Sequence, residues 1–311
     1  MTASDIVSEL LASIGMKPGH ALPDDTARLQ VHGNKVVGTH LIPGLTVDIE
    51  EQADGVAARI TVEEGARLAR PVHVCFGLLP ERGLQRIVLD IDVKADSRAS
   101  ILAHCTFPNA VEVEHRMDAA ITVGAGADYS YFERHVHGPA GGVLVVPRAK
   151  VVLEEKARFK TEFELIKGSA GAIAFDYSVD CHAHSVLDMI ARISGKGNDT
   201  INIRERGNLI GAHSRAVLKS SIALRDNARA EVYNELTASG PYSRGHVDCK
   251  EIVQDNGVAR AVPIVEVNDP TAHVTHEAAI GSVDSKQLET LMSRGLTGDE
   301  AVELIIEGLL S

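Results

Sequence analysis

The sequence predicts a mainly β protein whose centre is a parallel β-helix, with a short helix at the N-terminus and a helical hairpin at the C-terminus. Strand-like runs fill the chain from about residue 31 to residue 267 without a helical pattern between them. Small polar turns recur between these runs. Most are about 30 residues apart, a period typical of stacked solenoid coils.

Residues 1–20 are the predicted N-terminal helical segment. Four apolar residues follow helical spacing there: Ile6, Leu10, Leu11 and Ile14. Ser4 or Asp5 is the expected N-cap, because a short polar side chain accepts hydrogen bonds from the first free backbone N–H groups of a helix. Gly19 and His20 are expected to end the segment.

Residues 21–280 are the predicted β-helix core. Strand-like runs include 36–42, 121–123, 151–153 and 230–236, and the recurring turns are 64–67, 96–99, 126–128, 155–158, 226–229 and 255–257. A β-sandwich also has turns at short intervals, so turn spacing alone does not separate the two folds. The long extent without helices favours the β-helix, as do the small residues at the turns, where stacked coils approach closely.

Residues 281–311 are the predicted C-terminal helical region. Two capping boxes, Asp284-Ser-Lys-Gln287 and Thr297-Gly-Asp-Glu300, predict two helices with a break at Gly295. Their apolar positions exceed what one short helical pair can bury: Leu288, Leu291, Val302, Ile305, Ile306 and Leu309. We therefore expect the pair to pack on the β core, which is the simpler interpretation, or to face a partner.

Composition narrows the class of function. The net charge is −12 and the pI is about 5.6, which argues against a nucleic-acid partner because such proteins concentrate Lys and Arg. Four cysteines occur without a CxxC pair, as is typical of reduced thiols rather than of disulfides or a closed zinc site. With no apolar run of membrane-spanning length and no basic leader, the cytoplasm is the expected compartment and no membrane partner is expected.

Three residues near the C-terminus indicate metal chemistry: Cys249, His276 and Glu277. Thiolate is the usual ligand of iron–sulfur clusters, imidazole replaces it in some, and a carboxylate suits a cluster that must later leave. Adjacent strand residues face opposite sides, so His276 and Glu277 can share one metal only near a strand end, a bend or a subunit interface. A buried structural cysteine and a solvated His-Glu pair are the more common interpretation of such residues.

Several motifs between residues 247 and 309 carry a family resemblance. They are Asp248-Cys-Lys250, the run 269–278, the predicted helix 287–297 and the closing segment 300–308. Through them the segment resembles the C-terminal region of the SufB/SufD family of iron–sulfur cluster scaffolds. Upstream, Ala103-His-Cys-Thr-Phe-Pro108 resembles a strand of the same family, and a weaker likeness extends the resemblance over most of the chain from Leu84 onward.

The resemblance implies a right-handed parallel β-helix that dimerises through its core and docks a SufC-like ABC ATPase with its C-terminal helices. It implies a scaffold, not an enzyme, that receives sulfur from a donor protein and builds a transient iron–sulfur cluster. Carried over by position, Cys249, His276 and Glu277 are cluster ligands and Cys105 is the sulfur relay. SufB-like Cys249 and Glu277 combined with a SufD-like stretch at 279–284 favour a homodimer over pairing with a SufB/SufD paralogue.

The chain departs from the family along the sulfur channel. It has no tryptophan, although the family's channel uses one. His135 and His137 align near polar and aromatic channel positions, and Arg148 is the cation nearest to the position of the channel lysine. These three are therefore the predicted channel residues.

Two other functions remain open from the sequence. Carbohydrate-active enzymes use β-helices and paired carboxylates, for which Glu114, Glu133 or Asp180 could serve. Only 4% of the residues are aromatic, which leaves few platforms for stacking sugar rings. A structural solenoid that only recruits an ATPase is the other alternative.

Overall fold

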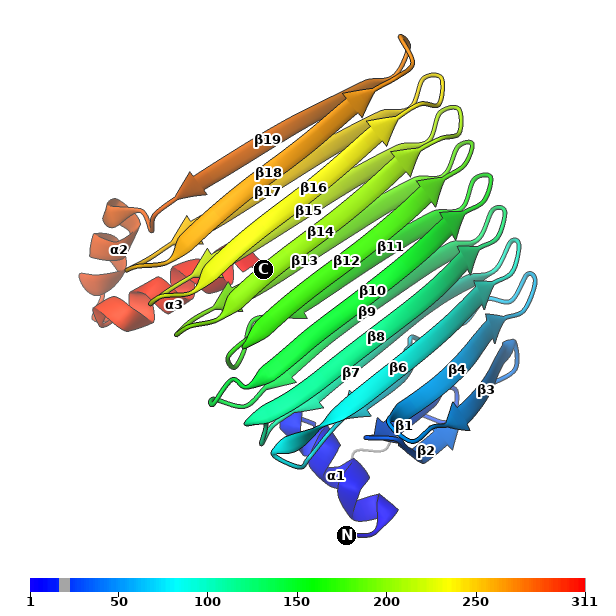
Figure 1. The fold of residues 1–311 in the computed structure, drawn as a ribbon, viewed down its shortest axis with the longest axis horizontal. Helices are drawn as coiled ribbons and strands as arrows, with labels where there is room; N and C mark the ends of the chain where they lie inside the picture. The colour runs from blue at the N-terminus through cyan, green and yellow to red at the C-terminus, as the bar shows by residue number, and fades with distance from the viewer. Residues whose placement is uncertain (17–22, 311) are drawn as a thin grey trace.

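The computed structural model describes residues 1–16 and 23–310, most of which form a solenoid of two facing β-sheets (Figure 1). One sheet contains, in spatial order, β19 (His273–Gly281), β17 (Arg244–Val253), β15 (Arg215–Leu224), β13 (Val186–Gly195), β11 (Arg158–Leu165), β9 (Asp128–His137), β7 (Arg98–Phe107), β5 (Val72–Gly77), β1 (Arg28–His32) and β2 (Lys35–His40). The other contains β18 (Val258–Val267), β16 (Arg229–Ala238), β14 (Thr200–Leu209), β12 (Ala172–Cys181), β10 (Val143–Leu153), β8 (Glu112–Val123), β6 (Arg82–Val93), β4 (Gly55–Val62) and β3 (Leu45–Glu51).

The chain alternates between the sheets, so each coil contributes one strand to each. Strands one coil apart pair in parallel, as Cys105 of β7 does with His135 of β9. This confirms the predicted parallel β-solenoid and excludes the sandwich. At the N-terminal end the pattern differs from the prediction, because β1 pairs with β2 and β3 with β4 in antiparallel fashion.

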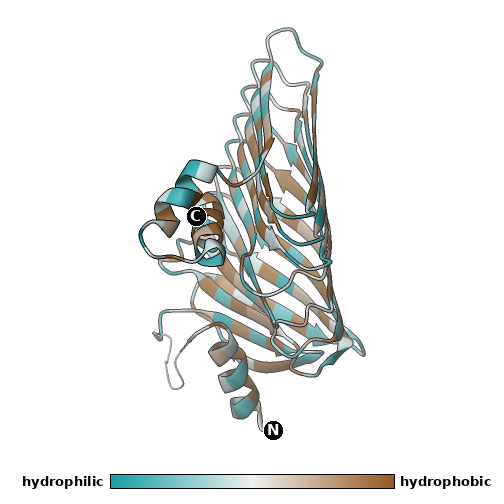
Figure 2. Cartoon of the chain, turned by 90° about the vertical axis from the view of Figure 1, so that its left-hand side faces the viewer, coloured by the Kyte–Doolittle hydropathy of each residue, from teal (hydrophilic) through white to brown (hydrophobic). Residues whose placement is uncertain are grey.

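The core lies between the two sheets. Along most strands alternate residues are buried, and Figure 2 shows the alternation as hydrophobic and hydrophilic stripes across the strands. Stacked coils place like residues side by side, as in Tyr129 and Phe159, whose rings are 5.5 Å apart and inclined by 12°. Burial of these stacked apolar columns is the main source of stability of such a fold.

The helices lie at the ends and edge of the solenoid (Figure 1). The first, α1 (Ala3–Ser13), is capped by Thr2, with Asp5 as the reciprocal partner of a capping box, so the predicted cap at Ser4 or Asp5 was wrong by two to three residues. The predicted end at Gly19 and His20 falls outside the described residues. None of the helices in the described part of the chain combines the length and the hydropathy needed to cross a bilayer.

The two predicted C-terminal helices are present as α2 (Ser285–Met292) and α3 (Gly298–Leu310). Thr297 forms the predicted reciprocal capping box with Glu300. At α2 the predicted box is only half formed among the described residues, because Asp284 accepts a hydrogen bond from the Gln287 N–H but the Gln287 side chain does not bond back. Four residues of α3 are buried: Ala301, Val302, Ile306 and Leu310. Val302, Ile306 and Leu310 form an apolar cluster with Ala223 of β15, which confirms packing on the β core.

Asp199 joins neighbouring turns at one edge of the solenoid. Its buried carboxylate accepts hydrogen bonds from the Ser169 hydroxyl and from the backbone N–H groups of Ala170, Gly171 and Lys196, at 2.6–2.9 Å. In Asp199→Ala these donors lose their acceptor, and an unsatisfied buried group costs roughly 1–3 kcal/mol. We therefore expect the free energy of unfolding, measured by urea denaturation, to fall by about 3 kcal/mol.

Asp128→Ala is the matched control for this prediction. The side chain of Asp128 is 44% exposed and pairs with Arg98 at 3.7 Å, a type of surface contact worth less than about 1 kcal/mol. Equal losses of stability in the two variants would show that Asp199 does not hold the turns together.

Candidate functional site

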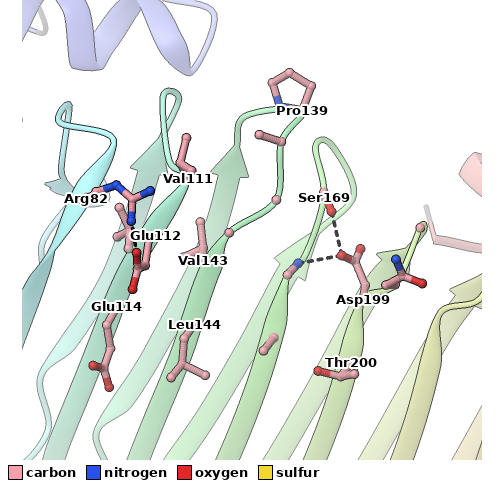
Figure 3. Close-up of a pocket in the computed structure, with 18 of the residues that line it drawn as sticks. Arg82, Val111, Glu112, Glu114, Pro139, Val143, Leu144, Ser169, Asp199 and Thr200 are labelled. Atoms are coloured by element: carbon pink, nitrogen blue, oxygen red, sulfur yellow. Dashed lines mark hydrogen bonds and ion pairs between the residues drawn. The ribbon is translucent and has the colours of Figure 1, made fainter.

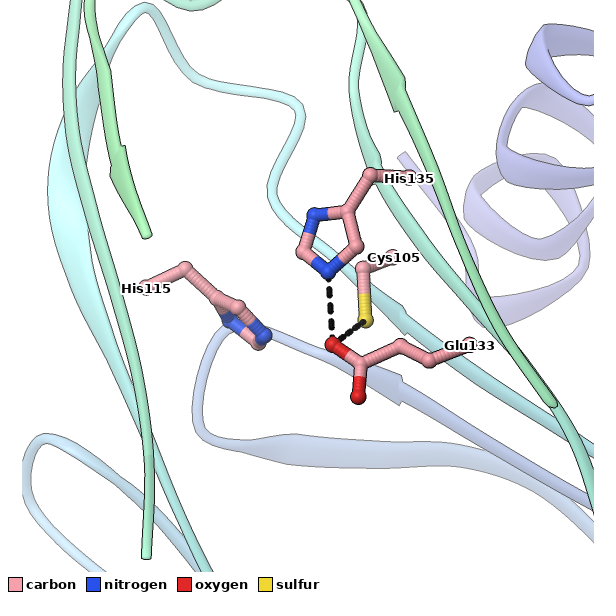
Figure 4. Close-up of side chains that lie close together, drawn as sticks. All are labelled: Cys105, His115, Glu133 and His135. Carbon is pink, nitrogen blue, oxygen red and sulfur yellow. Dashed lines mark hydrogen bonds and ion pairs between the residues drawn. The ribbon is translucent and has the colours of Figure 1, made fainter. Parts of the chain in front are cut away.

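A polar cluster lies inside the solenoid around Cys105 (Figure 4). Cys105 comes from β7, His115 from β8, and Glu133 and His135 from β9; each is at most 1% exposed. One ligand atom from each of the four residues lies within 4.8 Å of all the others. Within residues 1–16 and 23–310 it is the only such group of three or more His, Cys, Asp or Glu side chains.

Hydrogen bonds hold these side chains in fixed orientations. Glu133 Oε1 lies 2.6 Å from His135 Nε2 and 4.0 Å from Cys105 Sγ. His135 Nδ1 lies 3.2 Å from Nε2 of His137, the second predicted channel histidine. His115 Nε2 and Glu133 Oε2 are both buried and have no hydrogen-bond partner among the described residues.

Burial sets the charges in the cluster. It lowers the pKa of each of His115, His135 and His137 to about 3, so all three imidazoles are neutral at neutral pH. It also raises the pKa of Glu133 to about 7 and holds the pKa of the Cys105 thiol well above its usual value. Because His135 is neutral at neutral pH, its contact with Glu133 is a hydrogen bond rather than an ion pair.

A second polar group surrounds Cys249 on β17, five strands along the same sheet. Cys249 is fully buried, and Asn234 Nδ2 lies 3.5 Å from its Sγ. Glu251 is on the same strand face and accepts a hydrogen bond from the Ser220 hydroxyl at 3.5 Å. Burial raises the pKa of Cys249 to about 11 and that of Glu251 to about 7, so this thiol is also protonated at rest.

Two columns of inward-facing residues connect the polar groups. In the sheet that holds both cysteines, one register column contains Glu133, Phe163, Ala191, Ser220 and Cys249. In the facing sheet, a column contains Tyr177, Glu205 and Asn234. Strands pair at spacings of ~4.8 Å, so the path from Cys105 to Cys249 is about 24 Å long.

The facing column supplies polar groups where the first column is apolar. Tyr177 interacts electrostatically with both Glu133 and Glu205. With its amide reversed, Asn234 donates to the Glu205 carboxylate at 3.0 Å. Burial raises the pKa of Glu205 to about 8. We call Tyr177, Glu205 and Asn234, together with the polar groups at either end, the polar track. Burying a carboxyl without a charged partner lowers the stability of the folded chain, so stability does not explain why the polar track is there.

The predicted cluster ligands are only partly brought together within one chain. On β19, His276 pairs with Val247 and Glu277 with Asp248, and both side chains are exposed. Residues in register share a sheet face, so His276 faces the same side as Cys249 while Glu277 faces the opposite side. Their role as a ligand set remains a prediction.

The predicted channel residues also separate. His135 and His137 lie in the interior beside Cys105, whereas Arg148 is exposed on the outer face of β10.

The carboxylates considered for sugar cleavage also lie in different places. Glu133 is interior, while Glu114 and Asp180 lie on strand faces that alternate with buried residues. These three do not form a catalytic pair across a cleft.

A surface groove of about 1150 Å³ runs along one edge of the solenoid (Figure 3). Ser169 and Gly171 line it together with Asp199. The Ser169 carbonyl accepts a hydrogen bond from His137 Nδ1 at 3.0 Å. A chain of direct contacts therefore runs from the groove through His137 and His135 to the Cys105 cluster.

A second surface feature lies between the C-terminal helices. Six residues of α2 and α3 line a groove of about 420 Å³: Lys286, Gln287, Thr290, Leu291, Leu304 and Ile305. Leu304 is 47% exposed. Packing of α3 on the core therefore leaves apolar surface of the helical pair in contact with solvent.

Sequence reasoning missed several interior polar residues: His115, Glu205, Asn234 and Glu251. One signal was available, because Glu251 is two residues from Cys249 and residues at that spacing share a strand face. The remaining residues depend on the register between coils. No local pattern in the sequence places Glu205 near Cys249.

Comparison with known proteins agrees with the family resemblance found in the sequence. A family model described as "SUF system FeS cluster assembly, SufBD core domain" matches residues 89–309. A Methanocaldococcus jannaschii protein described as an iron-sulfur cluster assembly SufBD family protein is 34% identical over 313 residues, covering 100% of this chain and 99% of the relative. A Pyrococcus horikoshii protein with the same description is 36% identical over 284 residues, covering 91% of this chain and 86% of the relative. The Bacillus subtilis iron-sulfur cluster assembly protein SufB is 32% identical over 262 residues, covering 81% of this chain and 54% of SufB.

Proposed function

The chain belongs to the SufBD family of iron–sulfur cluster assembly proteins, and from that membership we propose that it is a scaffold that receives sulfur at Cys105 and builds a transient cluster at Cys249. The buried polar track between the two cysteines carries the proposal. Its buried carboxyls have no charged partner and therefore lower the stability of the fold. Their presence is explained if they provide hydrogen-bonding groups along a path for a polar sulfur species. The groove beside Ser169 offers a docking place for the sulfur donor protein.

Sulfur loading is a thiol exchange. The Cys105 thiol passes its proton to Glu133, and the thiolate attacks the terminal sulfur of a donor persulfide. The donor's S–S bond breaks, the donor leaves as a thiolate, and Cys105 holds a persulfide. No net oxidation occurs, because the zero-valent sulfur moves from one thiolate to another.

Transfer over about 24 Å requires a small carrier, because the two cysteines are too far apart to react directly. Hydrosulfide can attack the Cys105 persulfide, restoring the Cys105 thiolate and forming hydrodisulfide. Hydrodisulfide then delivers the sulfur to the Cys249 thiolate and regenerates hydrosulfide. Along the way Tyr177, Glu205 and Asn234 supply hydrogen-bonding groups.

Cluster assembly requires the last coil to open. Cys249 is sealed in the isolated chain, whereas His276 and Glu277 are exposed on the terminal strand. The end of the solenoid is also apolar, with exposed Ile264, Val265, Val267 and Ile280 on β18 and β19. A second copy of the chain would cover this surface and bring two sets of the three ligands together, each chain supplying half of the site.

An ABC-type ATPase partner is proposed to control this opening. The apolar groove between α2 and α3 is its docking site. Because α3 packs against Ala223 of β15, in an apolar cluster that Ile252 of β17 also contacts, movement of the helical pair would be transmitted to the strand that holds Cys249.

Anaerobic assembly tests the proposed function. With a SufC-like ATPase, a persulfide donor and ferrous iron, we expect the protein to gain an oxygen-sensitive brown chromophore. Iron and sulfide analysis with visible absorption measures it. Cys181→Ser is the matched control, because Cys181 is fully buried on β12 but lies outside both columns, so it should assemble the cluster normally. A colourless, iron-free wild type would contradict the scaffold role.

A further inference from the structure

The hydrogen bonds around His115 fix which of its nitrogens carries the proton. The side-chain N–H groups of Gln85 donate to the carbonyls of Gly33 and Gly77, at 3.0 and 3.1 Å. The Gln85 Oε1 atom must then point at His115 Nδ1, 3.1 Å away, and it can only accept. Nδ1 therefore carries the hydrogen, and His115 Nε2 presents a bare lone pair to the cluster.

A second chain of contacts fixes His135 in the same way. The Ser169 carbonyl can only accept, so His137 Nδ1 donates to it and His137 Nε2 is an acceptor. His135 Nδ1 then donates to His137, and His135 Nε2 is left with a lone pair facing Glu133 Oε1 at 2.6 Å. His115 is thus held by Gln85 and His135 by His137, and Gln85 and His137 are in turn anchored on backbone carbonyls; such supporting hydrogen bonds orient metal-ligating histidines.

The centre of the cluster therefore contains acceptors without enough donors. A proton on Glu133 would satisfy His135 but would leave His115 Nε2 without a partner among the described residues. A single cation between the four side chains would satisfy all of them. Cys105 and Glu133 would each contribute one negative charge, which balances a divalent ion in a buried, low-dielectric place.

We propose that Cys105, His115, Glu133 and His135 form a mononuclear binding site for a divalent transition metal such as zinc or ferrous iron. Mixed thiolate, imidazole and carboxylate ligands suit these ions. In a tetrahedral site with bonds of about 2.0–2.3 Å the ligand atoms lie roughly 3.4 Å apart. The four atoms, already within 4.8 Å of one another, need only small movements to reach this geometry.

Nothing in the geometry of the metal site depends on the proposed sulfur transfer, but the ion and the sulfur would compete for Cys105. Metal binding would displace the thiol proton and hold Cys105 as a thiolate. A metal-bound Cys105 cannot simultaneously carry a persulfide. The ion would therefore protect the thiolate until sulfur arrives.

Metal titration of the full-length protein tests the inference. After treatment with a chelator, the protein is titrated with Zn²⁺ or Co²⁺ and dialysed, and bound metal is counted by elemental analysis. We expect one tightly bound ion per chain and, with Co²⁺, tetrahedral visible bands together with a thiolate-to-cobalt charge-transfer band. Cys105→Ser should abolish the charge-transfer band, whereas Cys249→Ser should retain it, which separates this site from the proposed cluster site.

Two further variants test the geometry. Glu133→Gln, which is close to isosteric, removes a ligand and should weaken Zn²⁺ binding by more than tenfold, while His137→Phe removes the support of His135 and should weaken it by roughly 10–100-fold. Circular dichroism melts establish that each variant is folded, and Cys181→Ser should bind like the wild type. The absence of a tight ion in the wild type would overturn the inference. So would undiminished affinity, or an undiminished charge-transfer band, in both Cys105→Ser and Glu133→Gln.

Discussion

Replacing Cys249 with serine should lower cluster content by at least about tenfold, because even the loss of a group that only supports a metal ligand costs roughly 10–100-fold in affinity. A hydroxyl is a poor ligand for iron in a sulfide cluster, whereas a thiolate is the usual one. The substitution is close to isosteric, and the side-chain amide of Asn234, 3.5 Å from the thiol, can form a hydrogen bond with the new hydroxyl in either of its orientations. Iron and sulfide content after anaerobic assembly is the measurement.

Cys181→Ser controls for the loss of any buried thiol, and His276→Ala tests the neighbouring strand. Because His276 shares a sheet face with Cys249, its loss should also reduce cluster content. Wild-type levels of iron in Cys249→Ser would remove Cys249 as a ligand, whatever the other variants show.

Glu205→Leu should block sulfur delivery from Cys105 while leaving direct assembly from free sulfide intact. Loss of a polar contact in a buried path costs roughly 1–3 kcal/mol, which corresponds to roughly 5–160-fold in rate. Glu205→Gln keeps a polar side chain of the same size and is expected to transfer sulfur. The rate at which persulfide forms on Cys249 after Cys105 is loaded is the measurement. Equal rates in Glu205→Leu and Glu205→Gln would contradict a polar path.

The same substitution has a pH-dependent effect on stability. Burial raises the pKa of Glu205 to about 8 in the folded chain, so folding is opposed at any pH above the ordinary carboxyl pKa. The opposition grows as the pH rises towards 8, because ionisation increasingly favours the unfolded chain. Relative to the wild type, Glu205→Leu should therefore gain stability between pH 5 and about pH 8, measured by urea denaturation. This gain separates a transfer defect from misfolding.

Much of the fold could be predicted from the sequence because turns and strands are local. Turns are present at 64–65, 95–96 and 255–256, each within one residue of a predicted stretch, although the predicted turn 96–99 extends into β7. The N-cap of α2 and the capping box of α3 are equally local. By contrast, whether β1 pairs with β2 in parallel or antiparallel fashion depends on distant strands. The alternation of apolar and polar residues along a strand does not indicate the direction of its partner.

The site was harder to predict than the fold. Cys105 and Cys249 were identified through the resemblance, but the track between them depends on which residues stack across coils. From β5 onward, paired residues are offset by 28 to 30 positions, because the turns differ in length. A shift of one residue reverses the face of every side chain. Glu205 and Asn234 therefore could not be placed beside Cys249 from spacing alone.

The location of labelled sulfur tests the central claim most directly. The protein is loaded with an isotopically labelled persulfide donor, chased with unlabelled hydrosulfide, alkylated and digested, and the peptides containing Cys105 and Cys249 are analysed by mass spectrometry over time. We expect the label to appear first on Cys105 and then on Cys249, and we expect Cys105→Ser to prevent both. Label reaching Cys249 in Cys105→Ser at the wild-type rate would contradict an interior path between the two cysteines.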